Sequence, residues 1–289
     1  MVTRTYSIAG VDCTVSSDTL LLELIDASYG AFRVGPDDRE DGYRLSVERV
    51  GAGVRLADSR GNERTVEHEQ EALVRALDLI VQRVIGGLAD QGVYAIHAAS
   101  LARCGRGLIV SGPSGAGKST IALGLVARGL QILSDELALV SPDAHTLLPY
   151  RRSVHIRPGT PELIGELAFL QRRPRYELGG GNEWSLLPDE LETVFPGCLG
   201  GPAQVTHALL VEQRNDGGES ALEPVPSALA AVELLRATPA AADDFGGVLQ
   251  RFSTLAGGLS CARLRPGTLE SSLDLIVDWF ESGGEPEGA

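Results

Sequence analysis

Lysine is nearly missing from this chain. Of the 25 basic residues only Lys118 is a lysine, and the other 24 are arginines. A guanine-specific GTPase is therefore excluded, because its base-reading motif, Asn/Thr-Lys-x-Asp, would need a second lysine. The single lysine marks a position that requires a compact ammonium on a flexible stem rather than any positive charge.

Positive charge is scarce as a whole. The formal net charge is −14 at pH 7, and such a field repels phosphate backbones and anionic lipid surfaces. We therefore expect no nucleic-acid partner and no membrane partner. An anionic ligand has to be bound by a local positive site.

Long apolar runs and clustered cysteines are also missing. No apolar run approaches the roughly 18 residues that a membrane-spanning helix needs, and the N-terminal residues show no secretory signal pattern. The four cysteines are widely scattered and form no metal-ligand spacing with the five histidines. These features predict a soluble, cytoplasmic protein with reduced thiols.

The residues that are present indicate two folded units. Residues 1–66 alternate apolar and polar positions in short runs and predict a small antiparallel sheet. A helix is predicted to follow, because one apolar stripe recurs at steps of three and four residues, at Leu73, Leu77, Ile80, Val81, Val84 and Leu88. We predict a small N-terminal α+β unit over residues 1–90 and a second domain over residues 91–289.

The order of strands and helices predicted for the second domain indicates an α/β fold. Strands are predicted at 107–112, 130–133, 137–140, 146–148, 208–211 and 261–264, and helices at 119–128, 227–237, 242–257 and 269–280. Residues 171–189 are rich in Arg, Gly and Pro and have no periodicity. They are interpreted either as a mobile substrate loop or as a plain surface loop.

A glycine-rich loop between the first of these strands and the next helix carries the chemistry. It satisfies the pattern G-x-x-x-x-G-K-S/T completely and predicts a site for ATP and Mg²⁺. Its backbone N–H groups would surround the β-phosphate, Lys118 would reach the β- and γ-phosphates, and the Ser119 hydroxyl would bind Mg²⁺. An accidental match is disfavoured by the strand–loop–helix context and by the use of the only lysine. The expected binding residues are Gly112, Pro113, Ser114, Gly115, Ala116, Gly117, Lys118, Ser119 and Thr120.

Two acidic residues follow the next predicted strand. Phosphoryl transfer needs a proton acceptor and a carboxylate near the metal. If this strand pairs in parallel with the strand before the glycine-rich loop, both loops lie at one edge of the sheet. Asp135 is then the candidate general base and Glu136 a candidate Mg²⁺ ligand. The alternative is an ordinary acidic strand end or a cap for the next turn.

Two further residues are weaker candidates. His97 would bond Asp135 or the γ-phosphate, although a lone histidine between apolar residues is also typical of a structural residue. Arg157 would neutralise charge in the transition state and so contact the nucleotide, or it is a solvated surface arginine.

Together these residues resemble a known family. The intervals between Ile96-His97-Ala98, the glycine-rich loop, Arg128-Gly129 and Ser134-Asp135-Glu136 are similar to those of the HPr kinase/phosphorylase family. The resemblance is greater to its shorter HPr-kinase-like relatives in bacterial pathways for modified peptides, and it covers residues 92–160. It implies a P-loop core of the HPr kinase/phosphoenolpyruvate carboxykinase type and transfer of a γ-phosphate to a serine hydroxyl.

The resemblance also implies roles for particular residues. Asp135 would take the hydroxyl proton, with His97 as its partner and Lys118 on the phosphates. HPr kinases assemble, so a homo-oligomer is expected. The family often has Asp at the position of Glu136, and its full-length members have a different N-terminal unit and an HPr-binding segment that this chain lacks. The expected acceptor is therefore a serine of a peptide, as in kinases that tailor lasso-type precursors, or a small hydroxylated metabolite.

Other functions compete with this one. In a regulatory nucleotide-binding module or slow NTPase, Asp135 would orient water instead of a substrate hydroxyl. An ABC-type ATPase is disfavoured because residues 255–260 depart from the LSGGQ motif. A scaffold without a nucleotide would leave the glycine-rich loop and Lys118 unexplained.

Overall fold

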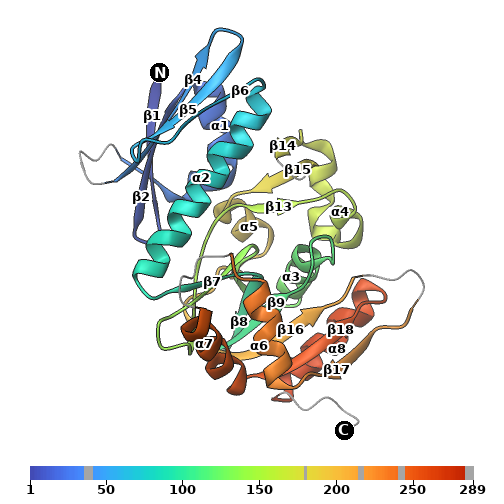
Figure 1. The fold of residues 1–289 in the computed structure, drawn as a ribbon. Coiled ribbons are helices and arrows are strands. Elements are labelled where there is room, and N and C mark those ends of the chain that lie inside the picture. Colours follow the sequence, from blue (N-terminus) through green and yellow to red (C-terminus); the bar gives the residue numbers. More distant parts are fainter. Residues whose placement is uncertain (36–41, 179–180, 214–217, 240–244, 284–289) are drawn as a thin grey trace. The chain divides into compact units, whose positions relative to one another are not determined.

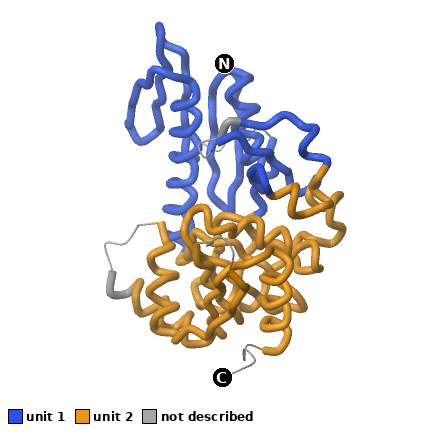
Figure 2. The backbone as a smooth tube through the Cα atoms, turned by 90° about the vertical axis from the view of Figure 1, so that its right-hand side faces the viewer, with its two compact units in different colours: residues 1–91, 151–159, 169–190 blue, residues 92–150, 160–168, 191–289 orange. Residues whose placement is uncertain are grey.

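The computed structural model describes residues 1–35, 42–178, 181–213, 218–239 and 245–283 (Figure 1). These residues form two compact units (Figure 2). Unit 1 consists of residues 1–91, 151–159 and 169–190, and unit 2 of residues 92–150, 160–168 and 191–289.

The division into units differs from the predicted one in its middle part. The first segment of unit 1 ends next to the predicted boundary, but residues 151–159 and 169–190 also belong to unit 1. The reason is hydrogen bonding within that unit. The Ser153 backbone N–H donates to the Ser28 carbonyl at 3.2 Å, and the Ser185 hydroxyl donates to the Ala27 carbonyl. Neither contact is visible in local sequence patterns.

The N-terminal sheet of unit 1 has the strand order β3-β1-β2-β4-β5-β6. Its strands are β1 Val2–Ile8, β2 Val11–Ser17, β3 Arg33–Val34, β4 Tyr43–Val50, β5 Gly53–Asp58 and β6 Glu63–Val66. The prediction of an antiparallel sheet is wrong for one pair, because β2 and β4 are parallel, with Cys13 opposite Tyr43. A parallel pair needs a crossover connection, and the unpredicted helix α1 Thr19–Tyr29 lies in that connection.

Helices α1 and α2 pack with this sheet through apolar side chains. Helix α1 begins where the Asp18 carboxylate accepts a hydrogen bond from the Leu21 N–H at 2.9 Å, which is a typical N-cap. It buries Leu22 and Ile25. Helix α2 Glu69–Asp90 was predicted from its stripe, and it buries Leu73, Ile80, Val84 and Leu88. A short 3₁₀ turn, η1 Gly30–Phe32, follows α1.

A second, smaller sheet in unit 1 contains β13 Val154–Ile156, β15 Gly181–Leu186 and β14 Tyr176–Leu178, in that order. It replaces the unstructured loop expected over residues 171–189. Strand β15 pairs with β13 in the register Val154 opposite Leu186, and with β14 in the register Tyr176 opposite Glu183. Of the expected glycine centre, residues 179–180 lie outside the described residues.

Unit 2 is built on a mixed sheet with the order β10-β8-β9-β16-β12-β11-β7, to which β18 and β17 are added beside β16. The strands are β7 Tyr94–His97, β8 Ala99–Arg103, β9 Arg106–Ser111, β10 Gln131–Ser134, β11 Leu137–Val140, β12 Thr146–Leu148, β16 Ala203–Val211, β17 Ala221–Pro224 and β18 Ser260–Arg265. The longer helices are α3 Lys118–Ala127, α6 Ser227–Arg236, α7 Phe245–Gly257 and α8 Leu269–Glu281. Shorter elements are α4 Thr160–Leu163, η2 Gly165–Arg172 and α5 Pro188–Val194, of which the last two cross the unit boundary.

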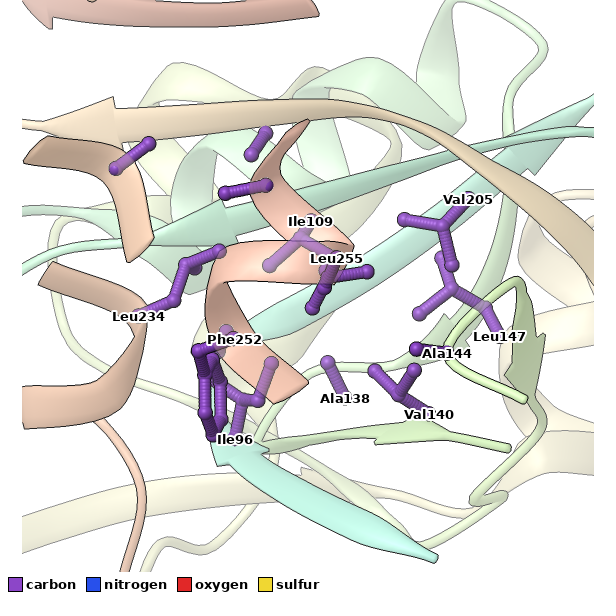
Figure 3. Close-up of a cluster of buried hydrophobic side chains, with 14 of the residues drawn as sticks. Ile96, Ile109, Ala138, Val140, Ala144, Leu147, Val205, Leu234, Phe252 and Leu255 are labelled. Carbon is purple, nitrogen blue, oxygen red and sulfur yellow. The ribbon is translucent and has the colours of Figure 1, made fainter. Parts of the chain in front are cut away.

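The core of unit 2 lies between the sheet and helices α6 and α7. Ile96 and Ile109 from the strands meet Leu234 of α6 and Phe252 of α7 in one buried cluster (Figure 3). Helix α3 packs closely on α8, because a Cβ on Gly124 would lie 2.6 Å from Leu273 Cδ1. The strands, helices and hairpin predicted for this unit are found, except that residues 242–244 of the predicted helix 242–257 lie outside the described residues, and α4 and β17 were not predicted. Within the described ranges, no helix has the length and apolar character to cross a bilayer.

Candidate functional site

The glycine-rich loop connects β9, which ends at Ser111, to α3, which begins at Lys118. Two of its glycines are required by geometry. A Cβ on Gly112 would lie 2.5 Å from the Val211 carbonyl oxygen of β16, and Gly117, the N-cap of α3, has a left-handed φ of 90°. The loop is therefore held tightly against β16 and turns its backbone directly into the start of a helix.

Lys118 bridges this loop. Its Nζ donates to the Gly112 carbonyl at 2.8 Å and to the Pro113 carbonyl at 3.2 Å. The ammonium thus lies at the N-terminal end of α3, where the unpaired N–H groups and the helix dipole already favour an anion.

The two hydroxyl residues after Lys118 differ in their surroundings. Thr120 Oγ1 is hydrogen-bonded to Thr160 Oγ1 at 2.9 Å, which connects α3 to α4. Ser119 is half-buried in the first turn of the helix. Thr120 is thus used for structure, and Ser119 keeps the position expected of a metal-binding hydroxyl.

The acidic pair follows β10, and the topology brings it to the edge of the sheet where the glycine-rich loop lies. Strand β10 does not pair with β9, contrary to the condition stated from the sequence, because β8 lies between them. Since β8 is antiparallel to both strands, β9 and β10 nevertheless run in the same direction. Their carboxyl ends therefore meet at one edge, which is where α/β sheets bind ligands.

Asp135 is buried, with 8% of its surface exposed, and Glu136 is half-buried. The turn that holds them is fixed by Ser134, whose Oγ accepts from the Glu136 N–H at 3.2 Å and from the Leu137 N–H at 3.0 Å. Ser134 therefore takes the two amide N–H groups that a capping carboxylate would take. This observation favours a role for Asp135 other than a turn cap.

His97 lies beside the acidic turn. It ends β7 opposite Leu137, and the next residue, Ala98, donates its N–H to the Glu136 carbonyl at 3.0 Å. The His97 N–H donates to the Ala237 carbonyl, just after α6, at 2.7 Å. His97 is exposed, so it is not the buried core histidine of the alternative interpretation.

Arg157 belongs to unit 1, whereas the other predicted site residues belong to unit 2. Its Nε donates to Glu183 Oε1 at 2.9 Å, and only 6% of the Glu183 side chain is exposed. Arg157 therefore neutralises a buried carboxylate of its own unit. The structure gives it this local role and does not bring it together with the glycine-rich loop within one unit.

The basic segment around Arg157 is held together internally. Arg152 Nη2 lies 3.1 Å from His155 Nδ1, and a guanidinium can only donate, so Nδ1 accepts and the ring is neutral. Burial, with the neighbouring Arg152 as a second cause, lowers the pKa of His155 to about 3. The 3.6 Å approach of this ring to Glu183 is consequently not an ion pair at neutral pH.

Sequence reasoning missed the residues that follow β16. Strand β16 is parallel to β9, so Glu212 and Gln213 come to the same edge, and the Cβ position of Gly115 lies 3.7 Å from Gln213 Nε2. The signal was present, because a strand ending at Val211 was predicted. The rule that ligands bind at carboxyl ends of parallel strands would have selected the next two residues.

The residues fit a nucleotide and a magnesium ion. The loop leaves open space at Gly117, where the left-handed φ of 90° would strain any side chain, and the ammonium and helix start suit phosphate oxygens. Among the described residues, no three His, Cys, Asp or Glu side chains are grouped to hold a metal. Mg²⁺ needs no such group, because it usually keeps its waters and takes one or two protein ligands together with phosphates.

Comparisons with known proteins add little. No profile of a known family matches the chain, and no curated protein matches its sequence. The structure of the HPr(Ser) kinase/phosphatase from Coxiella burnetii matches with a TM-score of 0.25 and 16% identity, over 40% of this chain and 63% of that chain. This chain thus spans less than two thirds of that protein, and so low a TM-score carries no argument about fold or function.

Proposed function

We propose that this chain is an ATP-dependent phosphotransferase that moves the γ-phosphate to a hydroxyl, either a serine of a peptide or a small hydroxylated metabolite. One observation carries the proposal. The glycine-rich loop with Lys118 and the buried Asp135 follow two strands that run in the same direction, so a phosphate-binding loop and a proton acceptor share one sheet edge.

The loop residues bind and orient the nucleotide in this proposal. The backbone N–H groups of the loop and of the first turn of α3 hold the β-phosphate, and the Lys118 ammonium moves from the Gly112 carbonyl to the phosphate oxygens. Ser119 and Glu136 would hold Mg²⁺, which when bound neutralises charge on the phosphates.

Asp135 would perform the proton transfer. As the acceptor oxygen bonds to the γ-phosphorus, the bond from that phosphorus to the bridging oxygen of the β-phosphate breaks and ADP leaves. The hydroxyl proton passes to the Asp135 carboxylate. His97, held beside the acidic turn by the Ala98–Glu136 backbone bond, would polarise this carboxylate or the transferred phosphate.

The test is label transfer from γ-labelled ATP with Mg²⁺ to a panel of serine peptides and small hydroxylated compounds. Lys118→Ala and Asp135→Asn should each lower transfer at least about a hundredfold, because one removes the phosphate-binding charge and the other the base. Asp135→Asn should still bind nucleotide. The matched control is Asp274→Asn, which removes a carboxylate from a surface ion pair on α8 and should leave transfer unchanged.

The opposite result would favour the other candidate. If the chain binds and hydrolyses ATP, labels no acceptor, and is insensitive to Asp135→Asn, the base assignment fails. A regulatory nucleotide-binding module or slow NTPase would then be the better description.

A further inference from the structure

A pocket of about 420 Å³ opens next to the glycine-rich loop. Gly112 and Pro113 line it from the loop, and four charged side chains line it from the end of β16, from α6 and from β18: Glu212, Glu233, Arg236 and Arg263. Its size lies within the range of about 300–1,000 Å³ that is usual for small-molecule sites. None of these four charged residues is explained by binding of the nucleotide phosphates.

The pocket lies close to the position expected for the transferred γ-phosphate. The two carbonyl groups that accept from Lys118 Nζ belong to Gly112 and Pro113, and both residues line the pocket. A lysine in this motif contacts the β- and γ-phosphates. The pocket therefore begins at the γ-phosphate end of the loop.

A backbone hydrogen bond connects the wall of the pocket to the strand that holds His97. Ala237 lines it, and the Ala237 carbonyl accepts the His97 N–H at 2.7 Å. His97 is in turn next to the acidic turn of Asp135 and Glu136. The pocket wall at Ala237 is thus bonded to the strand that leads to the acidic turn, although Asp135, Glu136 and His97 are not among the residues that line the pocket.

The charges in the pocket balance one another. Arg236 lies 3.3 Å from Glu233, and Arg263 lies 3.9 Å from Glu212. Two positive and two negative side chains do not suit a second polyanion, but they suit a ligand that carries both signs. The pairs are long and partly exposed, with 34% of the Arg263 side chain and 35% of the Glu233 side chain accessible, so a ligand can exchange with them at little cost.

We propose that this pocket is the acceptor site and that the acceptor is a small hydroxylated zwitterion, a molecule with a hydroxyl, a carboxylate and an amine, as in the hydroxy amino acids. This inference rests on the proposed function and specifies its substrate class. Arg236 and Arg263 hold the carboxylate through paired N–H donors. Glu212 and Glu233 hold the ammonium, and the hydroxyl points to the γ-phosphate and Asp135.

The first experiment varies the charges of the ligand. Free L-serine, L-threonine and L-homoserine are compared as acceptors with serine amide, N-acetylserine and doubly capped serine, and with serine peptides. The zwitterions should be labelled, and the loss of either charge should raise the acceptor KM at least about tenfold. Binding of the same compounds is measured by calorimetry with ADP and Mg²⁺ present, which gives a result even if transfer is slow.

The second experiment varies the pocket. Arg263→Gln and Arg236→Gln should each raise the acceptor KM at least about fivefold while the KM for ATP stays unchanged. The matched control is Arg103→Gln, whose side chain is 39% accessible, close to the 34% of Arg263, and which pairs with Glu281 away from the pocket. It should change neither constant.

The possible results separate the two proposals. If peptides are phosphorylated and the free zwitterions neither bind nor react, the pocket inference is wrong and the kinase proposal stands. If capped serine is as good an acceptor as free serine, or both arginine variants behave like Arg103→Gln, the charges do not select the ligand and the inference is again wrong. If nothing is labelled and Asp135→Asn does not alter ATP turnover, the kinase proposal itself fails.

Discussion

The two units use clustered charge in opposite ways. In unit 1, Glu183 is almost fully buried and is bonded at 2.9 Å by Arg157, while Arg152 donates to a neutral His155. In unit 2, the four charged side chains of the pocket are partly exposed and pair loosely, at 3.3 and 3.9 Å. In the first cluster the charged groups are paired with one another. In the second cluster the pairs are loose enough for a ligand to replace one partner.

This difference shows how a basic segment in a sequence should be interpreted. Arg157 was predicted either to neutralise charge in the transition state or to be a solvated surface arginine. A buried carboxylate must be paired or it becomes very costly, and the single residue Glu183 is enough to give Arg157 a structural role. Whether an arginine can bind a ligand depends on the acidic residue that the fold places beside it. Here that acidic residue is distant in sequence.

The largest expected effect on stability is at Arg157, and it tests the contrast between the two units. Arg157→Gln leaves the Glu183 carboxylate buried without its guanidinium, so the free energy of unfolding should fall by about 1–3 kcal/mol. Chemical denaturation measures this loss, and label transfer by the folded variant should equal that of the wild type. A hundredfold loss of transfer with unchanged stability would restore Arg157 as a group that acts on the phosphate.

A second, smaller effect is a loss of stability at acidic pH, to which one histidine in each unit contributes. Burial, and secondarily Arg106, lower the pKa of His207 to about 4, and the pKa of His155 is lowered to about 3. An unfolded histidine titrates near 6.5. Between these values the unfolded chain binds protons that the folded chain does not, so stability should fall as the pH decreases from about 6.5 towards 4.

The contribution of His207 can be isolated. Its Nδ1 lies 2.8 Å from Thr206 Oγ1, and Thr206 Oγ1 donates to the Gly107 carbonyl, so Nδ1 carries the proton. A second proton would have to enter at Nε2, which is buried without a hydrogen-bond partner among the described residues. His207→Phe should therefore reduce the loss of stability between pH 6.5 and 4.5 by on the order of 1–2 kcal/mol. An unchanged pH profile would mean that His207 is not the sensitive group.

The smallest effect is expected at an exposed pair. Arg55 and Glu48 lie 2.7 Å apart on neighbouring strands of unit 1, but 41% and 31% of their side chains are accessible. Arg55→Ala should leave the free energy of unfolding nearly unchanged, because solvent screens such pairs. A loss as large as that of Arg157→Gln would show that burial of the paired acid does not decide how much these arginines stabilise the fold.

Local signals in the sequence were sufficient for the part of the fold that carries the site. The glycine spacing and Lys118 specify a loop between a strand and a helix, and Gly129, with a left-handed φ of 87°, follows the end of that helix. The acidic pair at the end of β10 was also found. These features depend on residues that are close in sequence.

The features that were missed depend on pairing between distant residues. Strand β8 separates β9 from β10, and Ser153 and Ser185 bond to Ser28 and Ala27 across the boundary expected between the two domains. Helix α1 had a local signal in Asp18 and its apolar stripe, but the alternation of the neighbouring strands hid it. The pocket charges come together only because β16, β18 and α6 converge, so composition gives no sign of them.

The position of β16 in the chain has a consequence for synthesis. The Thr206 hydroxyl bonds the Gly107 carbonyl across 99 residues, and the strand that confines Gly112 is made long after the glycine-rich loop has left the ribosome. Contacts of such long range form late, because the intervening chain must first be closed into a loop. A nascent chain that ends before β16 carries the whole motif but not the wall that shapes it, so the loop is confined only after residues 203–211 have been made.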